Sequence, residues 1–575
     1  MGEALHKVTA RRVAGVLRFA PALTVSILLL PIVAGFLGTL LPAFGYLPAI
    51  GGTSLSLDGW RRLVSAPGFS TSVISTLVTG IAASVLAVVG ALAFCASAWG
   101  RPWARRLGGW MAPILATPHS AIALGLAFLV APSGWVVRAI SPWLTGWTVP
   151  PDIATVGHSS GAALVLGLLL KEVPYLILMI IGALHQVAAS QHLAVARAAG
   201  YAHVESWLKV ILPQIYPQIR LPIFAVIAFS LSVVDVALIL GPTNPPTLAV
   251  LAVRWFTDAD ITNYFQASAA AILLVVLVVA VVGGWVLLER AAIGIGRRWI
   301  VSGRRRGGIN AAVTGITGAV MTLFVLAVLA IVGMGLWSLA TQWRFPDALP
   351  QAFSFANWLR QVRGMAEPAR WTLVVGLAAT AIALMLALAC LENESRAQVK
   401  TGSRTLWILY LPLLLPQVAF LFGAQVFLVR FNLDGAVAAV IVAHLIFVLP
   451  YLFLSLADPW RALDPRYART AASLGATPAR IFLRVKLPLL LRPVLIACAV
   501  AFAVSVGQYL ATLFPGNGRI PTLTTEAVTL AAGADRRVIG AYALMQSVLP
   551  LLFYLMAAAL PAWLYANRRG VQGWR

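Results

Sequence analysis

Apolar stretches long enough to cross a lipid bilayer recur along almost the whole of this chain. About 20 apolar residues match the hydrocarbon core of a bilayer. Of the 575 residues, 60% belong to the set AVILMFWYC and only 10% are charged. A water-soluble protein of this size could not bury so much apolar surface. The sequence therefore predicts an all-α polytopic membrane protein and excludes both a soluble enzyme and a disordered chain.

The apolar stretches divide into about twelve predicted transmembrane helices. They cover residues 20–41, 71–98, 108–131, 161–184, 219–241, 267–288, 313–337, 370–391, 406–429, 435–456, 491–513 and 541–564. The first follows basic residues, as a signal peptide would. It continues without a small-residue cleavage site, so we expect a retained helix.

The distribution of Lys and Arg predicts the orientation of these spans. Alternate loops, together with both termini, hold more than twice as many basic residues as the opposite loops. Because basic loops stay on the cytoplasmic side, both termini are expected in the cytoplasm of a bacterial cell. This rule also accounts for the net charge of +24, so no nucleic-acid partner is expected. The three cysteines lie in apolar runs and predict neither a disulfide framework nor a metal site.

Two segments repeat one another at a constant separation of 275 positions. The matched residues are Gly200, Trp207, Leu212 and Pro213 in the first segment, and Gly475, Phe482, Leu487 and Pro488 in the second. In each, an Ala-rich helix is expected to stop at the glycine, where a residue without Cβ can turn the chain. A short amphipathic helix follows, and Leu-Pro starts the next span. The pattern predicts two cytoplasmic helix–turn–helix loops that offer a docking surface to a twofold partner.

The repeat extends beyond these loops. The tripeptide Pro-Thr-Leu recurs at 246–248 and 521–523, again 275 positions apart. Pro118 and Gly125 match Pro416 and Gly423 at a larger separation, so the first half is expected to carry an extra loop before Pro174. Six helices in each half give both halves the same orientation. The chain is therefore predicted to be two direct six-helix repeats.

The loop pattern resembles the cytoplasmic signature of binding-protein-dependent ABC importer permeases. That signature is roughly E-A-A-x-x-x-G with L-P twelve residues later; Ala194 and Arg469 replace its acidic residue here. Double-length permeases for ferric iron, polyamines and thiamine are similar. The resemblance divides the chain into a first half at 1–290 (core 70–290), a basic cytoplasmic linker at 291–312 and a second half at 313–575 (core 368–565).

The resemblance also implies the partners. Two cytoplasmic ABC ATPase subunits would bind the two loops, and a periplasmic or extracellular solute-binding protein would dock on the other side. The solute would be small, with thiamine, ferric iron or a polyamine as the expected substrates. No G-x-x-x-x-G-K-[ST] phosphate loop or other catalytic motif occurs in the sequence, so ATP is expected on the partner and not on this chain.

A few ionisable or polar residues fall inside the apolar spans, where they are costly and usually functional. Lys171 and Glu172 adjoin a proline in the fourth span, and they could bind neighbouring helices or line the path. Asp235 could meet a cationic solute or pair with Lys171. Gln508 lies near the equivalent position of the second half. His119 and His444 are expected to be satisfied core residues.

Two other functions compete with the ABC permease. A self-powered, H⁺-coupled secondary transporter of twelve helices could use Asp235 or Glu172 as the proton carrier, but it would not need the repeated loops. A membrane-embedded enzyme would need a convergent catalytic set, and the sequence offers none.

Overall fold

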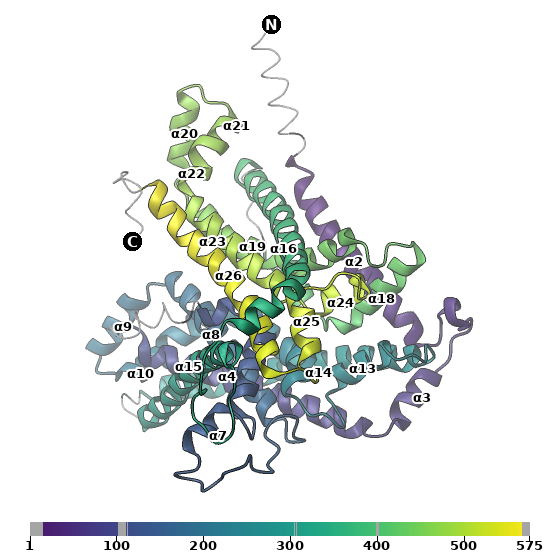
Figure 1. The fold of residues 1–575 in the computed structure, drawn as a ribbon. Helices are drawn as coiled ribbons and strands as arrows, with labels where there is room; N and C mark the ends of the chain where they lie inside the picture. Colours follow the sequence, from purple (N-terminus) through teal and green to yellow (C-terminus); the bar gives the residue numbers. More distant parts are fainter. Residues whose placement is uncertain are drawn as a thin grey trace.

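The computed structural model describes residues 15, 17–101, 111, 113–303, 305, 308–397 and 402–565, and its regular elements there are helices (Figure 1). The first part contains α2 (Ala20–Ala43), α3 (Asp58–Ser65), α4 (Phe69–Ala98), α6 (His119–Val130), α7 (Trp135–Ile140), α8 (Ala162–His185), α9 (Ala189–Ala198), α10 (His203–Ser206), α11 (Leu212–Ser232), α12 (Asp235–Leu240), α13 (Leu248–Phe256) and α14 (Asn263–Val301). The second part contains α15 (Ile309–Leu339), α16 (Ala356–Ala397), α17 (Ser403–Leu414), α18 (Val418–Arg430), α19 (Val437–Arg461), α20 (Pro465–Ser473), α21 (Pro478–Ile481), α22 (Leu487–Leu489), α23 (Leu491–Val506), α24 (Leu510–Gly516), α25 (Leu523–Leu530) and α26 (Arg536–Leu564).

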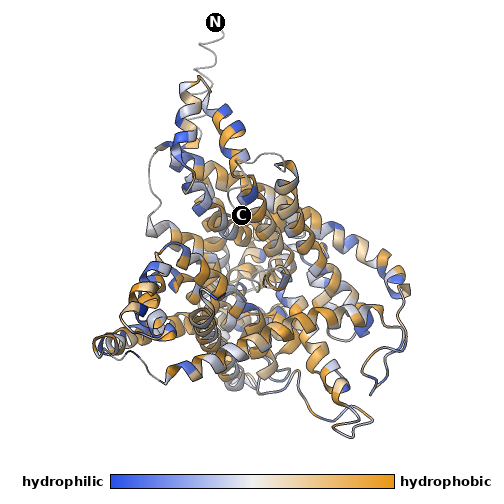
Figure 2. Cartoon of the chain, turned by 90° about the vertical axis from the view of Figure 1, so that its left-hand side faces the viewer, coloured by the Kyte–Doolittle hydropathy of each residue, from blue (hydrophilic) through white to orange (hydrophobic). Residues whose placement is uncertain are grey.

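Within the described residues, ten helices are long and apolar enough to cross a membrane. Two further helix pairs bring the total to twelve if each bent pair is one span. Apolar residues dominate the helices of the bundle, and hydrophilic residues gather at helix ends and in loops (Figure 2). These findings confirm the prediction of an all-α polytopic membrane protein. Residues 102–110 and 112, which include the start of the third predicted span, lie outside the described part.

Four of the predicted spans are not continuous helices; each is interrupted near its middle. In the second half, α17 and α18 meet at 85° on either side of Pro416. Leu415 before this proline has extended backbone, as the proline ring requires. In the first half the chain breaks at the matched position, directly before α6, at Pro118. The other two breaks separate α11 from α12 at 233–234, and α23 from α24 at 507–509.

The first helix of each half packs against the opposite half. Helix α2 lies along α18, and α15 lies along α6. At both crossings a glycine lets the backbones approach closely: a Cβ at Gly423 would lie 1.9 Å from the Gly35 carbonyl oxygen, and one at Gly125 would lie 2.6 Å from that of Ala330. Small residues at such crossings allow tight packing between transmembrane helices. Gly125 and Gly423, which the sequence paired, therefore have the same structural role.

The predicted repeat is visible in the connecting elements. Helices α10 and α21 start 275 positions apart, as do α12 and α24, and α13 and α25. The extra loop predicted for the first half occupies 131–161, where the second half needs only 431–436. The basic segment 291–312 differs from a simple linker: α14 continues to Val301, and α15 already begins at Ile309.

Candidate functional site

The first repeated loop is a helix–turn–helix. Helix α9 ends at a turn in which Gly200 has φ +88°, a left-handed conformation that favours glycine. The backbone N–H of Gly200 donates to the carbonyl of Arg197 at 2.8 Å, and that of Tyr201 donates to Ala196 at 3.2 Å. This paired arrangement is a Schellman motif, which satisfies the last carbonyls of a helix. Helix α10 then starts in a new direction.

The second repeated loop has the same geometry. Gly475 has φ +81°, and its N–H donates to the carbonyl of Ala472 at 2.9 Å. The N–H of Ala476 donates to Ala471 at 3.0 Å, which completes the same motif. The glycines that the sequence singled out thus close equivalent turns, each preceded by a helix and followed by a shorter one.

After each turn the chain enters a π-helical turn. These turns cover Trp207–Ile211 and Phe482–Lys486, again 275 positions apart. Such wide turns are rare and often lie at functional sites. The predicted aromatic positions differ in burial: Trp207 is fully buried, whereas Phe482 is half-buried and lies against Trp460 at the end of α19.

The Leu-Pro pairs start the next helices differently in the two halves. Leu212 and Pro213 open α11, which continues into the bundle. Leu487 and Pro488 open the short α22, and the helices on either side of Leu490 are bent by 76°. The two halves are therefore equivalent in local structure, but the second loop leaves its span at a sharper angle.

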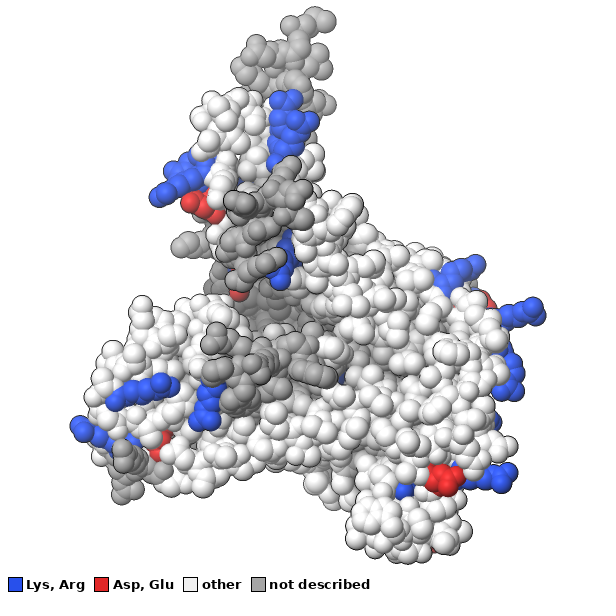
Figure 3. Space-filling model, turned by 60° about the vertical axis from the view of Figure 1, so that its left-hand side comes forward, with Lys and Arg blue, Asp and Glu red and all other residues white. Residues whose placement is uncertain are grey.

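Different contacts hold the two loops. In the first, the N–H of Ala202 donates to the Arg305 carbonyl at 3.1 Å, and Lys209 Nζ donates to the Trp299 carbonyl at 3.0 Å. In the second, Lys486 Nζ donates to a Glu392 carboxylate oxygen at 2.7 Å at the end of α16. Figure 1 shows α20–α22 beside the end of α16, and α9 and α10 at the left of the molecule. Lys and Arg gather at protruding ends of the surface, whereas most of the face in Figure 3 is uncharged.

Lys171 lies inside α8 and is buried. Its Nζ donates three hydrogen bonds, to the carbonyls of Ile114 at 3.0 Å, Leu115 at 3.0 Å and Thr117 at 2.6 Å. These carbonyls belong to the broken end before Pro118, where no intrahelical donor continues. A cation at the carboxyl end of a helix satisfies its last carbonyls. Lys171 therefore stabilises the break, and it forms no ion pair with Asp235.

Glu172, the next residue of α8, points to a different neighbour. Its carboxylate lies 3.8 Å from His119 Nε2, at the first residue of α6. Lys171 and Glu172, both in α8, thus contact the segment around Pro118. The expectation that Lys171 and Glu172 bind neighbouring segments agrees with these contacts.

Asp235 and Gln508 lie at the equivalent breaks of the two halves. Asp235 is the first residue of α12, directly after the break at 233–234, and it is 9% exposed. Gln508 lies within the break between α23 and α24, and its side-chain oxygen is buried without a hydrogen-bond partner. A Cβ on the neighbouring Gly507 would lie 3.9 Å from Pro118, so this break approaches the first half.

Sequence analysis missed a buried polar contact between the halves. Gln546 in α26 donates to the Ser120 hydroxyl of α6 at 2.9 Å and to Thr524 of α25 at 2.6 Å. A single amide in the apolar run around Gln546 was the only available signal. His444, by contrast, agrees with its predicted role, because its ring nitrogens contact the hydroxyls of Ser505 at 2.8 Å and Thr512 at 2.9 Å. Within the described residues, no group of three or more His, Cys, Asp or Glu side chains could hold a metal ion.

The chain is similar over most of its length to a known transporter subunit. It is 33% identical over 522 residues to the inner membrane ABC transporter permease protein YnjC of Escherichia coli (strain K12), a match that covers 90% of this chain and 93% of the relative. The chain belongs to the ABC transporter permease family. No family model matches it.

Two shorter relatives match only part of this permease. The molybdenum transport system permease protein ModB of Mycobacterium tuberculosis (strain ATCC 25618 / H37Rv) is 34% identical over 162 residues, which are 61% of ModB but 26% of this chain. The putrescine transport system permease protein PotI of Escherichia coli (strain K12) is 23% identical over 200 residues, 70% of PotI and 32% of this chain. Their length is close to that of one half, as expected for a fused, double-length permease.

Proposed function

We propose that this permease is the membrane subunit of an importer for a small solute and that two separate ATPase subunits drive it through the repeated loops. The observation that carries the proposal is the equivalence of the loops around Gly200 and Gly475, with the same Schellman turn and the same π-helical turn. One rigid loop in each half suits a partner with two equivalent subunits. A solute-binding protein would deliver the solute to the opposite side.

In this proposal the loops transmit movement to the broken spans. When the ATPase subunits close on ATP, they would draw α9–α10 and α20–α21 together and rock the two halves about the central breaks. Such a shift requires that the partner binds one state of the permease more tightly than the other. Both termini would lie in the cytoplasm, as the excess of Lys and Arg in alternate loops indicates. The name of the Escherichia coli relative YnjC places that protein in the inner membrane, and we propose the same location for this chain.

We expect ATP hydrolysis only when the ATPase partner is bound. Affinity-tagged chain from native membranes should co-purify with an ATPase, and removal of that partner by a chaotropic wash should abolish hydrolysis. Gly200→Val and Gly475→Val should each reduce the co-purified activity severalfold, because a β-branched residue opposes a positive φ. Gly283→Val in α14 is the control, because a Cβ there would meet nothing within 4 Å. Hydrolysis by the washed chain alone would contradict the proposal.

For the solute itself, we propose a cation such as thiamine, ferric iron or a polyamine that passes Asp235 and Gln508. One relative is named a putrescine permease, and Asp235 places a carboxylate at the break of the first half. Asp235→Asn should lower uptake of radiolabelled thiamine or putrescine about tenfold, since a charge-assisted contact is lost. Membrane levels and ATPase binding should not change. Asp258→Asn, at an exposed position, is the control; equal uptake by both variants would remove Asp235 from the path.

A further inference from the structure

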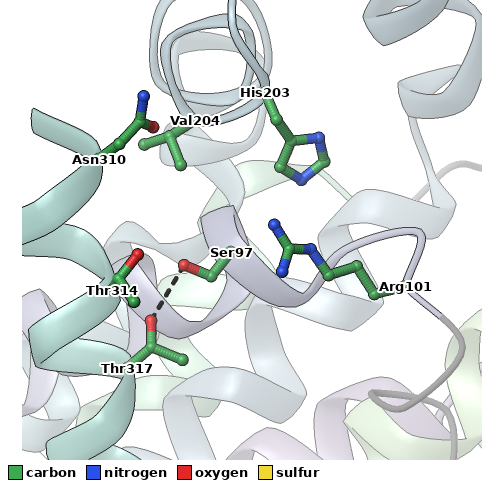
Figure 4. A pocket seen from close by; sticks show the side chains of 7 residues that line it. All are labelled: Ser97, Arg101, His203, Val204, Asn310, Thr314 and Thr317. Carbon is green, nitrogen blue, oxygen red and sulfur yellow. Dashed lines mark hydrogen bonds between the residues drawn. The ribbon is translucent and has the colours of Figure 1, made fainter.

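A cavity of about 400 Å³ lies where the first repeated loop meets the bundle. It is open to the surface and is bordered by the end of α4, by α10 and by the first turns of α15 (Figure 4). Its lining residues are Ser97, Arg101, His203, Val204, Asn310, Thr314 and Thr317. The polar lining consists of hydroxyls, an amide, an imidazole and a guanidinium, with no carboxylate among them. The cavity thus offers mainly hydrogen-bond donors and a positive charge.

The hydrogen bonding of His203 adds a donor to this cavity. A guanidinium only donates, and Arg197 contacts His203 Nδ1, so Nδ1 accepts and the proton of the neutral ring resides on Nε2. His203 Nε2 is buried, and the backbone of Ala96 at the end of α4 lies beside the ring. The Arg101 guanidinium lies beside the same ring in Figure 4. Ser97 and Thr317 already bond to each other at 3.0 Å.

Helix α16 of the second half carries carboxylates at positions where the corresponding helix α4 of the first half has alanines. Thr76 of α4 accepts from the N–H of Leu248, and Thr372 of α16 accepts from that of Leu523, so α4 and α16 correspond at a separation of 296 positions. At this separation, Ala96 and Ala98 of α4 match Glu392 and Glu394 of α16.

Those two carboxylates bind one lysine of the second loop and two arginines at the ends of α16 and α19. Glu392 binds Lys486 at 2.7 Å and Arg396 at 2.7 Å, and Glu394 binds Arg461 at 2.8 Å. In the first half the alanines at these positions offer no carboxylate, so neither position of α4 ties the first loop to the bundle by an ion pair.

We propose that the cavity binds a phosphate group, supplied by a phospholipid headgroup or by a soluble phosphate. Arg101 and His203 would donate to its oxygens, and Asn310 and Thr314 would supply further donors from α15. Phosphate oxygens are strong acceptors for such converging donors. Because the donors come from α4, α10 and α15, the bound phosphate would fix the first repeated loop to the bundle, as Glu392 fixes the second.

Thermal unfolding of the purified full-length chain tests this site. The chain is purified in a maltoside detergent, which carries no phosphate group, and is titrated with inorganic phosphate or, in a parallel sample, with phosphatidylglycerol. We expect Tm to rise with phosphate, with phosphatidylglycerol, or with both, and sodium chloride of equal ionic strength to have no such effect. A rise with only one additive identifies the source of the phosphate group. No rise with either additive overturns the proposal.

Variants distinguish this cavity from general charge effects. Asn310→Asp puts a carboxylate into the cavity at an exposed first-turn position, where an acid favours the helix and the fold should persist. It should weaken binding at least about tenfold, as should Arg101→Gln, because each removes or opposes a charge-assisted bond. Arg480→Gln, which removes an exposed arginine of the second loop, is the control and should bind as the unmodified chain does. An equal loss in the control would overturn the assignment.

Discussion

Replacing Gly423 by alanine is expected to remove most of the folded protein from the membrane. A Cβ at this position would lie 1.9 Å from the Gly35 carbonyl oxygen and 2.5 Å from the Thr39 amide nitrogen. Both obstacles are backbone atoms, which cannot rotate away, so α2 and α18 would have to separate. Overpacking a tight contact costs about 3 kcal/mol at the upper end of its usual range. Size-exclusion profiles of detergent extracts, followed by a fluorescent tag, measure the remaining folded fraction.

Two further alanine variants serve as the control and as a second test of the same effect on folded yield. Gly284→Ala in α14 is the matched control, because a Cβ there meets nothing within 4 Å. Gly125→Ala should behave more like Gly423→Ala, because its Cβ would lie 2.6 Å from the Ala330 carbonyl oxygen at the equivalent crossing. A normal yield of the Gly423→Ala protein would show that the crossing of α2 and α18 can open without loss of the fold.

The repeated loops could be predicted because their local structure depends on single residues at fixed spacing. Gly200 and Gly475 each close a turn with positive φ. Because few other residues adopt this conformation, the glycine itself is the sequence signal for the turn. Hydropathy placed a predicted span on each of the ten described helices that are long and apolar enough to cross a membrane, since each needs a long apolar run. Together these signals determined the fold class and the order of the two halves.

The breaks within the spans were not predictable from hydropathy, which measures apolar content and not the continuity of a helix. Pro118 and Pro416 offered a signal, although proline is also tolerated inside transmembrane helices, as Pro174 is within α8. The break at 233–234 contains two valines and offers no signal at all. Its position depends on packing between helices that are distant in sequence.

Residue partners at membrane depth were equally hidden. The sequence identifies Lys171 as a buried cation. Its partners are three backbone carbonyls, and a backbone carbonyl has no sequence signature. Gln546 and Ser120 lie more than 400 positions apart, and neither is ionisable, so their contact between the halves could not be inferred. A polar group in an apolar span indicates that a hydrogen-bond partner exists, but only the tertiary structure identifies that partner.

The contacts of Lys171 lead to a second large expected effect. Lys171→Met should lower the amount of folded chain strongly, because it leaves the carbonyls of Ile114, Leu115 and Thr117 without their donor. Hydrogen bonds to a charged group contribute about 1.5–3 kcal/mol each, and carbonyls in the bilayer have no water to replace them. Leu170→Met, a change of similar volume at the neighbouring buried position, is the control and should cost far less.

A double variant separates this role from an ion pair with Asp235. If Lys171 and Asp235 compensated each other, adding Asp235→Asn to Lys171→Met would restore folded protein, since it removes the uncompensated charge. The hydrogen bonds of Lys171 predict no restoration, because the three carbonyls would still lack a donor. Lys171→Arg should retain part of the yield, as a guanidinium can reach the same carbonyls with a different geometry. Yields of folded protein and Tm values of the four variants decide between the two roles, and full recovery in the double variant would contradict the capping of the broken helix.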